Sequence, residues 1–162
     1  MRSRILFAFA LALAASLFSG SAFAVDDWIV RESAQSVEET VSRLEEAITR
    51  SGSVVMAVFD HQAAAQAVGH ELPGSTVVVF AKPRTSSPLI GDNPRAAIDM
   101  PQKILVWEED GATFAGFVSP NALVTRYGFD PARPELETLR SALESLLAAA
   151  VSRQERPTSV TP

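Results

Sequence analysis

Residues 53–83 read SVVMAVFDHQAAAQAVGHELPGSTVVVFAKP. Two runs in this stretch, residues 54–59 and 76–80, consist almost entirely of apolar and β-branched side chains, a composition typical of buried strands. An alanine-rich segment between them holds both histidines of the protein. Functional groups often lie where a strand of a rigid scaffold ends. Asp60 and His61, at the end of the first run, are therefore the first candidates for a site.

More strands and two long helices are predicted around these two runs. A capping box formed by Ser36 and Glu39 opens the first long helix, and Gly52 follows its end. Pro134 stands at the first-turn position of the second, which carries a wide leucine stripe. The other expected elements are strands over residues 25–31, 103–107 and 112–118, an Asp110-Gly111 hairpin turn, and short helices over residues 62–68 and 121–127.

The order strand, helix, four strands, helix predicts an α+β fold with a mostly antiparallel sheet and both long helices on one face. Three of the strands are apolar at both alternating positions, whereas a sheet with one solvated face should alternate. A bare second face would exceed the apolar area that monomers normally expose. We therefore expect the proline-rich connection of residues 82–101, a second copy of the chain or a ligand to cover it.

The N-terminus predicts a secretory signal peptide over residues 1–24. Arg2 and Arg4 precede an apolar run, which is followed by the small-residue end Ala22-Phe23-Ala24. The run is too short to span a bilayer, so we expect a periplasmic or secreted protein with no membrane span after removal of the leader. The rest divides into a single α+β domain, residues 25–150, and a tail, residues 151–162, that we expect to be disordered.

Composition excludes several classes of function. The formal charge is −5, and removal of the leader's two arginines makes it −7, which disfavours nucleic acid and anionic lipid as partners. The chain has no cysteine, so disulfides and thiol catalysis are excluded. The glycines are isolated turn residues and form no phosphate loop, and we predict no cofactor.

A series of short motifs in the middle of the chain occurs in the same order in a known family. It runs through Asp60-His61-Gln62-Ala63-Ala64-Ala65, Val68-Gly69, Leu72-Pro73, the strand at 76–80, Lys82-Pro83, Pro88-Leu89 and residues 97–108, AIDMPQKILVWE. This series resembles the domain-of-unknown-function 302 family over a core of about residues 60–118. The resemblance implies a compact unit like a single TATA-box-binding-protein repeat, with strand, helix, four strands and helix. It implies no activity, because the family has none assigned.

Four residues are candidates for ligand contact: His61, Lys82, Asp99 and Trp107. His61 could act as a general acid or base or orient a ligand, with Lys82 as a cationic partner. Asp60 is a weaker candidate, because neighbours on a strand point to opposite faces and Asp60 could orient His61 only if the strand has already ended. Trp107 could line an apolar pocket, join a dimer face or pack in the core.

We expect a non-enzymatic exported module that binds an apolar small molecule or associates with itself as a homodimer. One alternative is an envelope enzyme that uses His61 as general acid or base. Another is a metal-binding protein, with His61 and His70 as weak candidate ligands. The two histidines lie nine residues apart and lack a close pairing motif, so no metal site is assigned.

Overall fold

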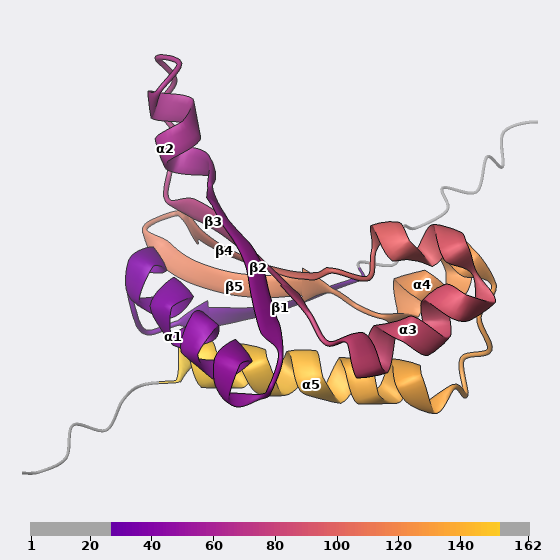
Figure 1. Ribbon diagram of the computed structural model, residues 1–162. Helices are drawn as coiled ribbons and strands as arrows, with labels where there is room; N and C mark the ends of the chain where they lie inside the picture. The colour runs from indigo at the N-terminus through magenta and orange to yellow at the C-terminus, as the bar shows by residue number, and fades with distance from the viewer. Residues whose placement is uncertain (1–26, 153–162) are drawn as a thin grey trace, which may run out of the picture.

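The computed structural model describes residues 27–152, which form a five-stranded sheet with two long helices on one face (Figure 1). The elements, in chain order, are β1 Trp28–Ser33, α1 Val37–Arg50, β2 Val54–Asp60, α2 His61–Gln66, β3 Ser75–Ala81, α3 Pro83–Asp92, the 3-10 helix η1 Pro94–Ile98, β4 Gln102–Glu109, β5 Ala112–Val118, α4 Asn121–Tyr127 and α5 Pro134–Val151. The predicted α+β fold is confirmed. The predicted leader and residues 153–162 of the predicted tail lie outside the described residues.

All neighbouring strands of the sheet pair antiparallel, in the order β1-β5-β4-β3-β2. β1 and β2 are therefore the two edges. The hairpin between β4 and β5 turns at Asp110 and Gly111, whose φ angles are 51° and 78°. Two central residues with positive φ match the right-handed twist of a two-residue hairpin, which is why the Asp-Gly pair predicted this turn.

The core lies between the sheet and the two long helices. Ser36 caps α1 by accepting a hydrogen bond from the Glu39 amide at 3.2 Å, as the capping box predicts. The predicted leucine stripe of α5 is buried against the sheet and α1. Fully buried side chains come from both layers and include Leu44, Ile48, Val78, Ile104, Phe117, Leu143 and Leu147. Apolar burial on this one face therefore provides the main stabilisation of the fold.

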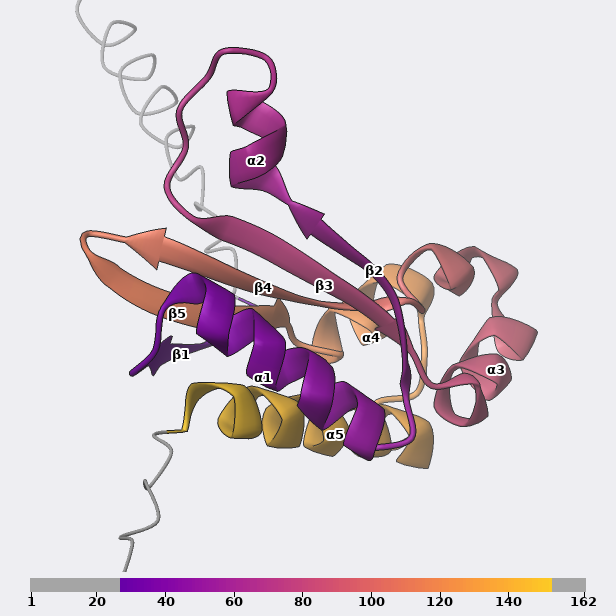
Figure 2. The ribbon, with the colours of Figure 1, turned by 60° about the vertical axis from the view of Figure 1, so that its left-hand side comes forward.

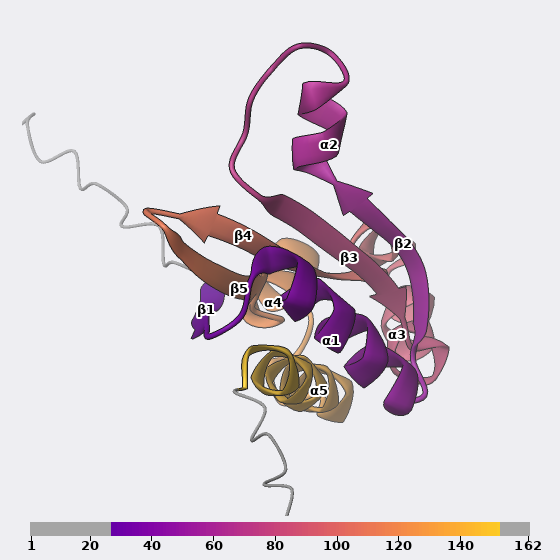
Figure 3. The same ribbon diagram turned by 90° about the vertical axis from the view of Figure 1, so that its left-hand side faces the viewer.

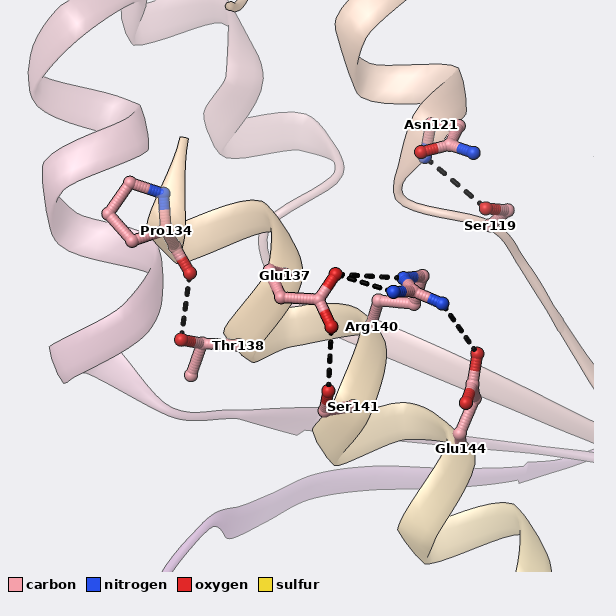
Figure 4. Close-up of polar contacts among 8 residues, drawn as sticks. All are labelled: Ser119, Asn121, Pro134, Glu137, Thr138, Arg140, Ser141 and Glu144. Carbon is pink, nitrogen blue, oxygen red and sulfur yellow. Dashed lines mark hydrogen bonds and ion pairs between the residues drawn. The ribbon is translucent and has the colours of Figure 1, made fainter. Parts of the chain in front are cut away.

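The outer surface of α5 carries a chain of charged contacts (Figure 4). Glu137 accepts hydrogen bonds from Arg140 at 2.5 Å and from the Ser141 hydroxyl at 3.2 Å, and Arg140 also reaches Glu144 at 3.4 Å. The hydrogen bond from Arg140 is the main cause that lowers the pKa of Glu137. These groups are exposed, so the contacts add little to the stability that the buried leucines provide.

The proline-rich connection, residues 82–101, is mostly helical and does not cover the second face of the sheet. It forms α3 and η1, which pack on each other at one end of the molecule, with α3 also packed on α5 and η1 on α4 (Figures 1 and 2). Pro83 and Pro94 occupy first-turn positions, where a helix needs no N–H from them. Buried Leu89 anchors α3 to the core, and Arg133 ties it to α5 through Asp92. Only its last residues, Asp99 and Pro101, reach the second face, at one end, so the connection leaves most of that face uncovered.

The second face of the sheet is apolar, as the strand sequences predict. Along β3, Val78 and Phe80 are buried against the helices, while Val77 and Val79 point to the other side. The register places further apolar side chains on that side: Trp28, Val30, Leu105, Trp107, Phe114 and Val118. Neither α1 nor α5 lies over this face (Figure 3). It is therefore an apolar surface with side chains only partly covered.

Replacing Leu147 by Ala should lower the free energy of unfolding by about 2–5 kcal/mol, because the fully buried side chain leaves a cavity between α5 and the sheet. Ile98, which is 75% exposed, is the matched control, and Ile98→Ala should cost less than about 0.5 kcal/mol. Urea denaturation followed by circular dichroism measures both. Equal losses would contradict this location of the core.

Candidate functional site

A groove of about 350 Å³ opens on the helix-free face of the sheet. Its floor is apolar and comes from the three central strands, with Val77 on β3, Leu105 on β4 and Gly116 on β5. The register pairs Val77 with Leu105 and Leu105 with Gly116, so these residues form one row across the sheet. Side chains from α4 and from the segment before β4 line the groove at one end. The groove is therefore a product of the sheet register and of α4.

Gly116 permits the close approach of the neighbouring strand β1 at the side of the groove. A Cβ atom at position 116 would lie 2.9 Å from the carbonyl oxygen of Ile29 and 3.1 Å from the Cγ2 atom of Val30. The Trp28 ring meets Trp107 edge-on, with 6.2 Å between centroids, and Trp107 packs against Phe114 at 5.7 Å. The predicted ligand contact Trp107 thus lies on the groove face, where it supports Trp28, which lines the groove.

The polar end of the groove is built around Asp99. Arg126 and Tyr127 both donate to the same oxygen of Asp99, Oδ2, each at 2.6 Å. Asp99 follows η1 and the other two residues end α4, so this cluster joins two segments that are distant in sequence. Lys103, also in the groove lining, adds a second positive charge beside Asp99.

Ionised Asp99 is favoured by these contacts. Burial by itself raises the pKa of Asp99, but the hydrogen bonds from Tyr127 and Arg126 lower it, as do the nearby positive charges. The net effect puts the pKa of Asp99 below its ordinary value of 3.8. The bond to Asp99 is also the main cause that raises the pKa values of both Tyr127 and Arg126. At neutral pH the cluster is thus an ion pair with a neutral phenol.

His61 also lines the groove, so the structure brings together two of the predicted contacts, His61 and Asp99. His61 is the first residue of α2, and its ring meets Phe59 edge-on at 4.9 Å. Within residues 27–152, no hydrogen bond involves the imidazole of His61. Asp60 caps α2 instead, by accepting from the Ala63 amide at 2.9 Å. Asp60 therefore has a structural role and does not orient the His61 ring.

Lys82 lies elsewhere, contrary to the prediction that it accompanies His61. Its Nζ donates to the carbonyl of Ser51 at 3.2 Å, and the residue lines a separate small cavity beside α3 and α5. The antiparallel register explains the separation. Asp60 pairs with Thr76 while Val54 pairs with Ala81, so the residues that follow β2 and β3 lie at opposite ends of the strand pair, about 20 Å apart.

The two histidines are both exposed, one at the start of α2 and the other in the loop after it. In the part of the chain that the structure describes, no three His, Cys, Asp or Glu side chains gather where they could hold a metal ion. The weak metal candidates His61 and His70 therefore gain no further ligands from the fold.

The two cations of the site, Arg126 and Lys103, were not among the predicted ligand contacts. Arg126 lies in a predicted helix, and Lys103 lies in a predicted strand and within the family-like series, but nothing in the sequence singles out either side chain as a ligand contact. Lys103 reaches the groove because it pairs with Val79 on the helix-free face. Arg126 reaches it because α4 returns beside η1, where the Asn93 amide donates to the carbonyl of Tyr127 at 3.3 Å. Sequence periodicity carries no signal for such a contact.

Tyr127→Phe should raise the pKa of Asp99 towards 3.8, because it removes one of two hydrogen bonds to the carboxylate. Ionised Asp99 stabilises the fold above about pH 4, and this contribution is lost as the pH falls through the lowered pKa. The variant should therefore have a lower unfolding free energy than the unchanged protein near neutral pH, and the difference should be smaller at about pH 3. Urea denaturation at both pH values, with NMR titration of Asp99, measures these effects.

Thr138→Val is the control for this experiment, because it removes a hydroxyl that donates only to the backbone carbonyl of Pro134, at 2.8 Å (Figure 4). Its effect on stability should not change between the two pH values. A pKa of Asp99 that is unchanged in Tyr127→Phe would contradict the described cluster.

Comparisons with known proteins agree with this fold. The crystal structure of an uncharacterized conserved protein DUF302 from Bacillus stearothermophilus superposes with a TM-score of 0.69 and 22% sequence identity, covering 76% of this chain and 97% of that one. At this identity the likeness shows the fold alone.

Two curated relatives share sequence with part of the chain. Fluoride-specific ion channel FluC 1 of Brucella suis biovar 1 (strain 1330) is 32% identical over 78 residues, which are 48% of this chain and 31% of that protein. Fluoride-specific ion channel FluC 2 of Brucella melitensis biotype 1 matches at the same identity and length, over 29% of that protein. The chain thus spans about three-tenths of these relatives. Within residues 27–152, no helix has the length and apolar character needed to cross a membrane.

The family assignment rests on a match over most of the chain. The family model described as "Domain of unknown function DUF302" matches residues 29–150. These bounds take in both long helices and nearly all of the sheet, and they extend well beyond the core on which the sequence resemblance was based. The chain therefore belongs to the DUF302 family.

Proposed function

We propose that this protein is an exported binding module whose groove takes a small amphipathic anion. The apolar part of the ligand lies on the sheet, and its anionic head lies beside Arg126 and Lys103. The single observation that carries the proposal is an apolar groove on the sheet with cationic side chains at one end. The predicted apolar ligand is retained in this proposal, with a charged head added.

The size and the lining of the groove suit a small ligand. Its volume of about 350 Å³ is near the lower limit of about 300–1,000 Å³ for small-molecule sites. Val77, Leu105 and Val118 offer the apolar floor, with a few polar side chains at the ends. Covering these side chains removes apolar surface from water, which is the main favourable contribution to binding such a ligand.

The charges at the polar end favour an anion. Asp99 is neutralised by Arg126 and also accepts from Tyr127. Arg126 remains 59% exposed and has further N–H donors, and Lys103 brings a second cation. The three charged groups sum to +1 in a chain whose formal charge is −5. A carboxylate head can accept from both cations without displacing the Asp99 pair.

An acid or base role for His61 is the second candidate function, supported by its place in the groove lining. The only ring contact that positions it within the described residues is with Phe59, so no carboxylate fixes its tautomer. Ligand contact is the simpler role for this side chain. The channel activity named for the Brucella relatives is not part of the proposal, because the match covers less than a third of those proteins.

Decanoate is a suitable probe, with decanol as the neutral equivalent, and titration calorimetry measures both. Decanoate should bind more tightly than decanol. Lys103→Gln should weaken decanoate binding roughly two- to fivefold, as expected for an exposed charge pair, and leave decanol unchanged. Leu105→Gln should weaken both ligands, because it places a polar group in the apolar floor.

Lys82→Gln is the matched control, since Lys82 lies in a different cavity. It should leave the affinity for decanoate unchanged. Equal affinity for decanoate and decanol would contradict the proposal that the ligand has an anionic head. Absence of binding for both, with the variants folded, would overturn the proposed groove ligand altogether.

A further inference from the structure

The edge strand β2 exposes an unusual amount of apolar side chain. Val54, Met56, Val58 and Phe59 are all more than two-fifths exposed, and no residue of β2 is buried. The strand stands at the end of the sheet order, so its outer side offers unpaired backbone groups to a further strand. β2 therefore combines the two features that promote strand pairing between chains.

The helix layer covers β2 only in part: Val55 packs against the core, whereas the other residues of β2 are exposed. Val58 pairs with Val78, which is fully buried under the helices, yet Val58 is 43% exposed on the same face. On the opposite face, Phe59 pairs with Val77 at the groove and is 51% exposed. Both faces of the sheet thus end in uncovered apolar side chains at this edge.

The usual protection of an edge strand is weak in β2. Natural edges carry lysine, proline, inward charges or bulges that prevent pairing. Residues 51–59 contain no charged residue and no proline. Within β2 the devices of this kind are one irregularity, between Val55 and Ala57, and the charged Asp60 at the last position. An antiparallel copy of this strand would place apolar side chains opposite apolar side chains along its length.

The segment after β2 projects from the rest of the domain (Figures 2 and 3). We call residues 61–74 the arm. Its helix, α2, has six residues and none of them is buried, whereas an isolated helix needs about 12–15 residues to be stable in water. Val68 and Leu72 in the loop of the arm are 72% and 47% exposed. The arm therefore lacks the packing that normally holds so short a helix.

Charge is distributed unequally between the two ends of β2. The arm end carries Asp60 and Glu71, and no lysine or arginine occurs between residues 51 and 81. The opposite end carries Lys82, whose Nζ bonds the carbonyl of Ser51, and Arg50 at the end of α1, which is ion-paired with Glu46 at 3.1 Å. A two-fold axis through the middle of β2 brings the acidic end of each chain to the basic end of the other.

We propose that β2 pairs antiparallel with β2 of a second copy of this chain. The pairing joins two five-stranded sheets into one continuous sheet and places each arm against the basic end of β2 in the other copy. A second copy fits better than an unrelated strand. The middle of β2 is uncharged and its two ends differ in charge, so two antiparallel copies bring opposite charges together. The helix-free groove lies on the face of the sheet and stays open in this arrangement.

Sedimentation velocity on the purified full chain tests the proposal, with Val58→Lys as the variant. The unchanged protein should sediment as a dimer, and Val58→Lys should raise the dimer dissociation constant at least about tenfold, because it buries a charge at the pairing edge. Val30→Lys is the matched control on the other edge strand, since Val30 is 45% exposed against 43% for Val58. It should leave the dimer intact.

Hydrogen–deuterium exchange supplies a second readout. The β2 amides should exchange faster in Val58→Lys than in the unchanged protein, with β4 amides the same in both. If Val58→Lys fails to fold by circular dichroism, Met56→Lys, at a position 63% exposed, replaces it with the same expectation. A monomeric unchanged protein would overturn the proposal. A dimer that Val30→Lys dissociates and Val58→Lys does not would also overturn it.

Discussion

The structure depends on one constraint. Both faces of the sheet are apolar, but the two long helices cover only one of them. Val78 and Val77 are adjacent on β3, yet the first is fully buried on the helix-covered face while the second faces the groove. Burial under the helices stabilises the fold, and the opposite face must remain partly wet or find another apolar surface. The groove and the exposed edge strand β2 both exist because the helices leave these apolar side chains uncovered.

The polar cluster of Asp99, Arg126 and Tyr127 closes the groove at one end of the uncovered face. α4 returns to the sheet after β5, beginning where Ser119 accepts from the Asn121 amide at 3.3 Å (Figure 4). Its last turn then delivers Arg126 and Tyr127 to Asp99. Partial burial alone would raise the pKa of Asp99, and the two donors more than offset this effect. One short helix thus closes this end of the groove and supplies one of its two cations.

Sequence predicted those parts of the fold that depend on local or periodic signals. Ser36, the leucine stripe of α5 and the Asp-Gly turn each have a physical cause within a few residues, and each prediction is confirmed. The pairing of His61 with Lys82 failed because it depends on strand register, which places the ends of β2 and β3 far apart. Arg126 was missed because its role requires a contact between α4 and the segment after η1.

The arm connects the groove with the edge of the sheet. His61 lines the groove but belongs to α2, whose side chains are not buried within the chain. α2 is held at its base by the Asp60 cap, by the hydrogen bond from Gln62 to the carbonyl of Leu72 at 3.2 Å, and by contacts with β3. Pairing of β2 with a second copy would add packing to the arm, which carries the His61 ring beside Phe59. Self-association and ligand contact would then both involve this one segment.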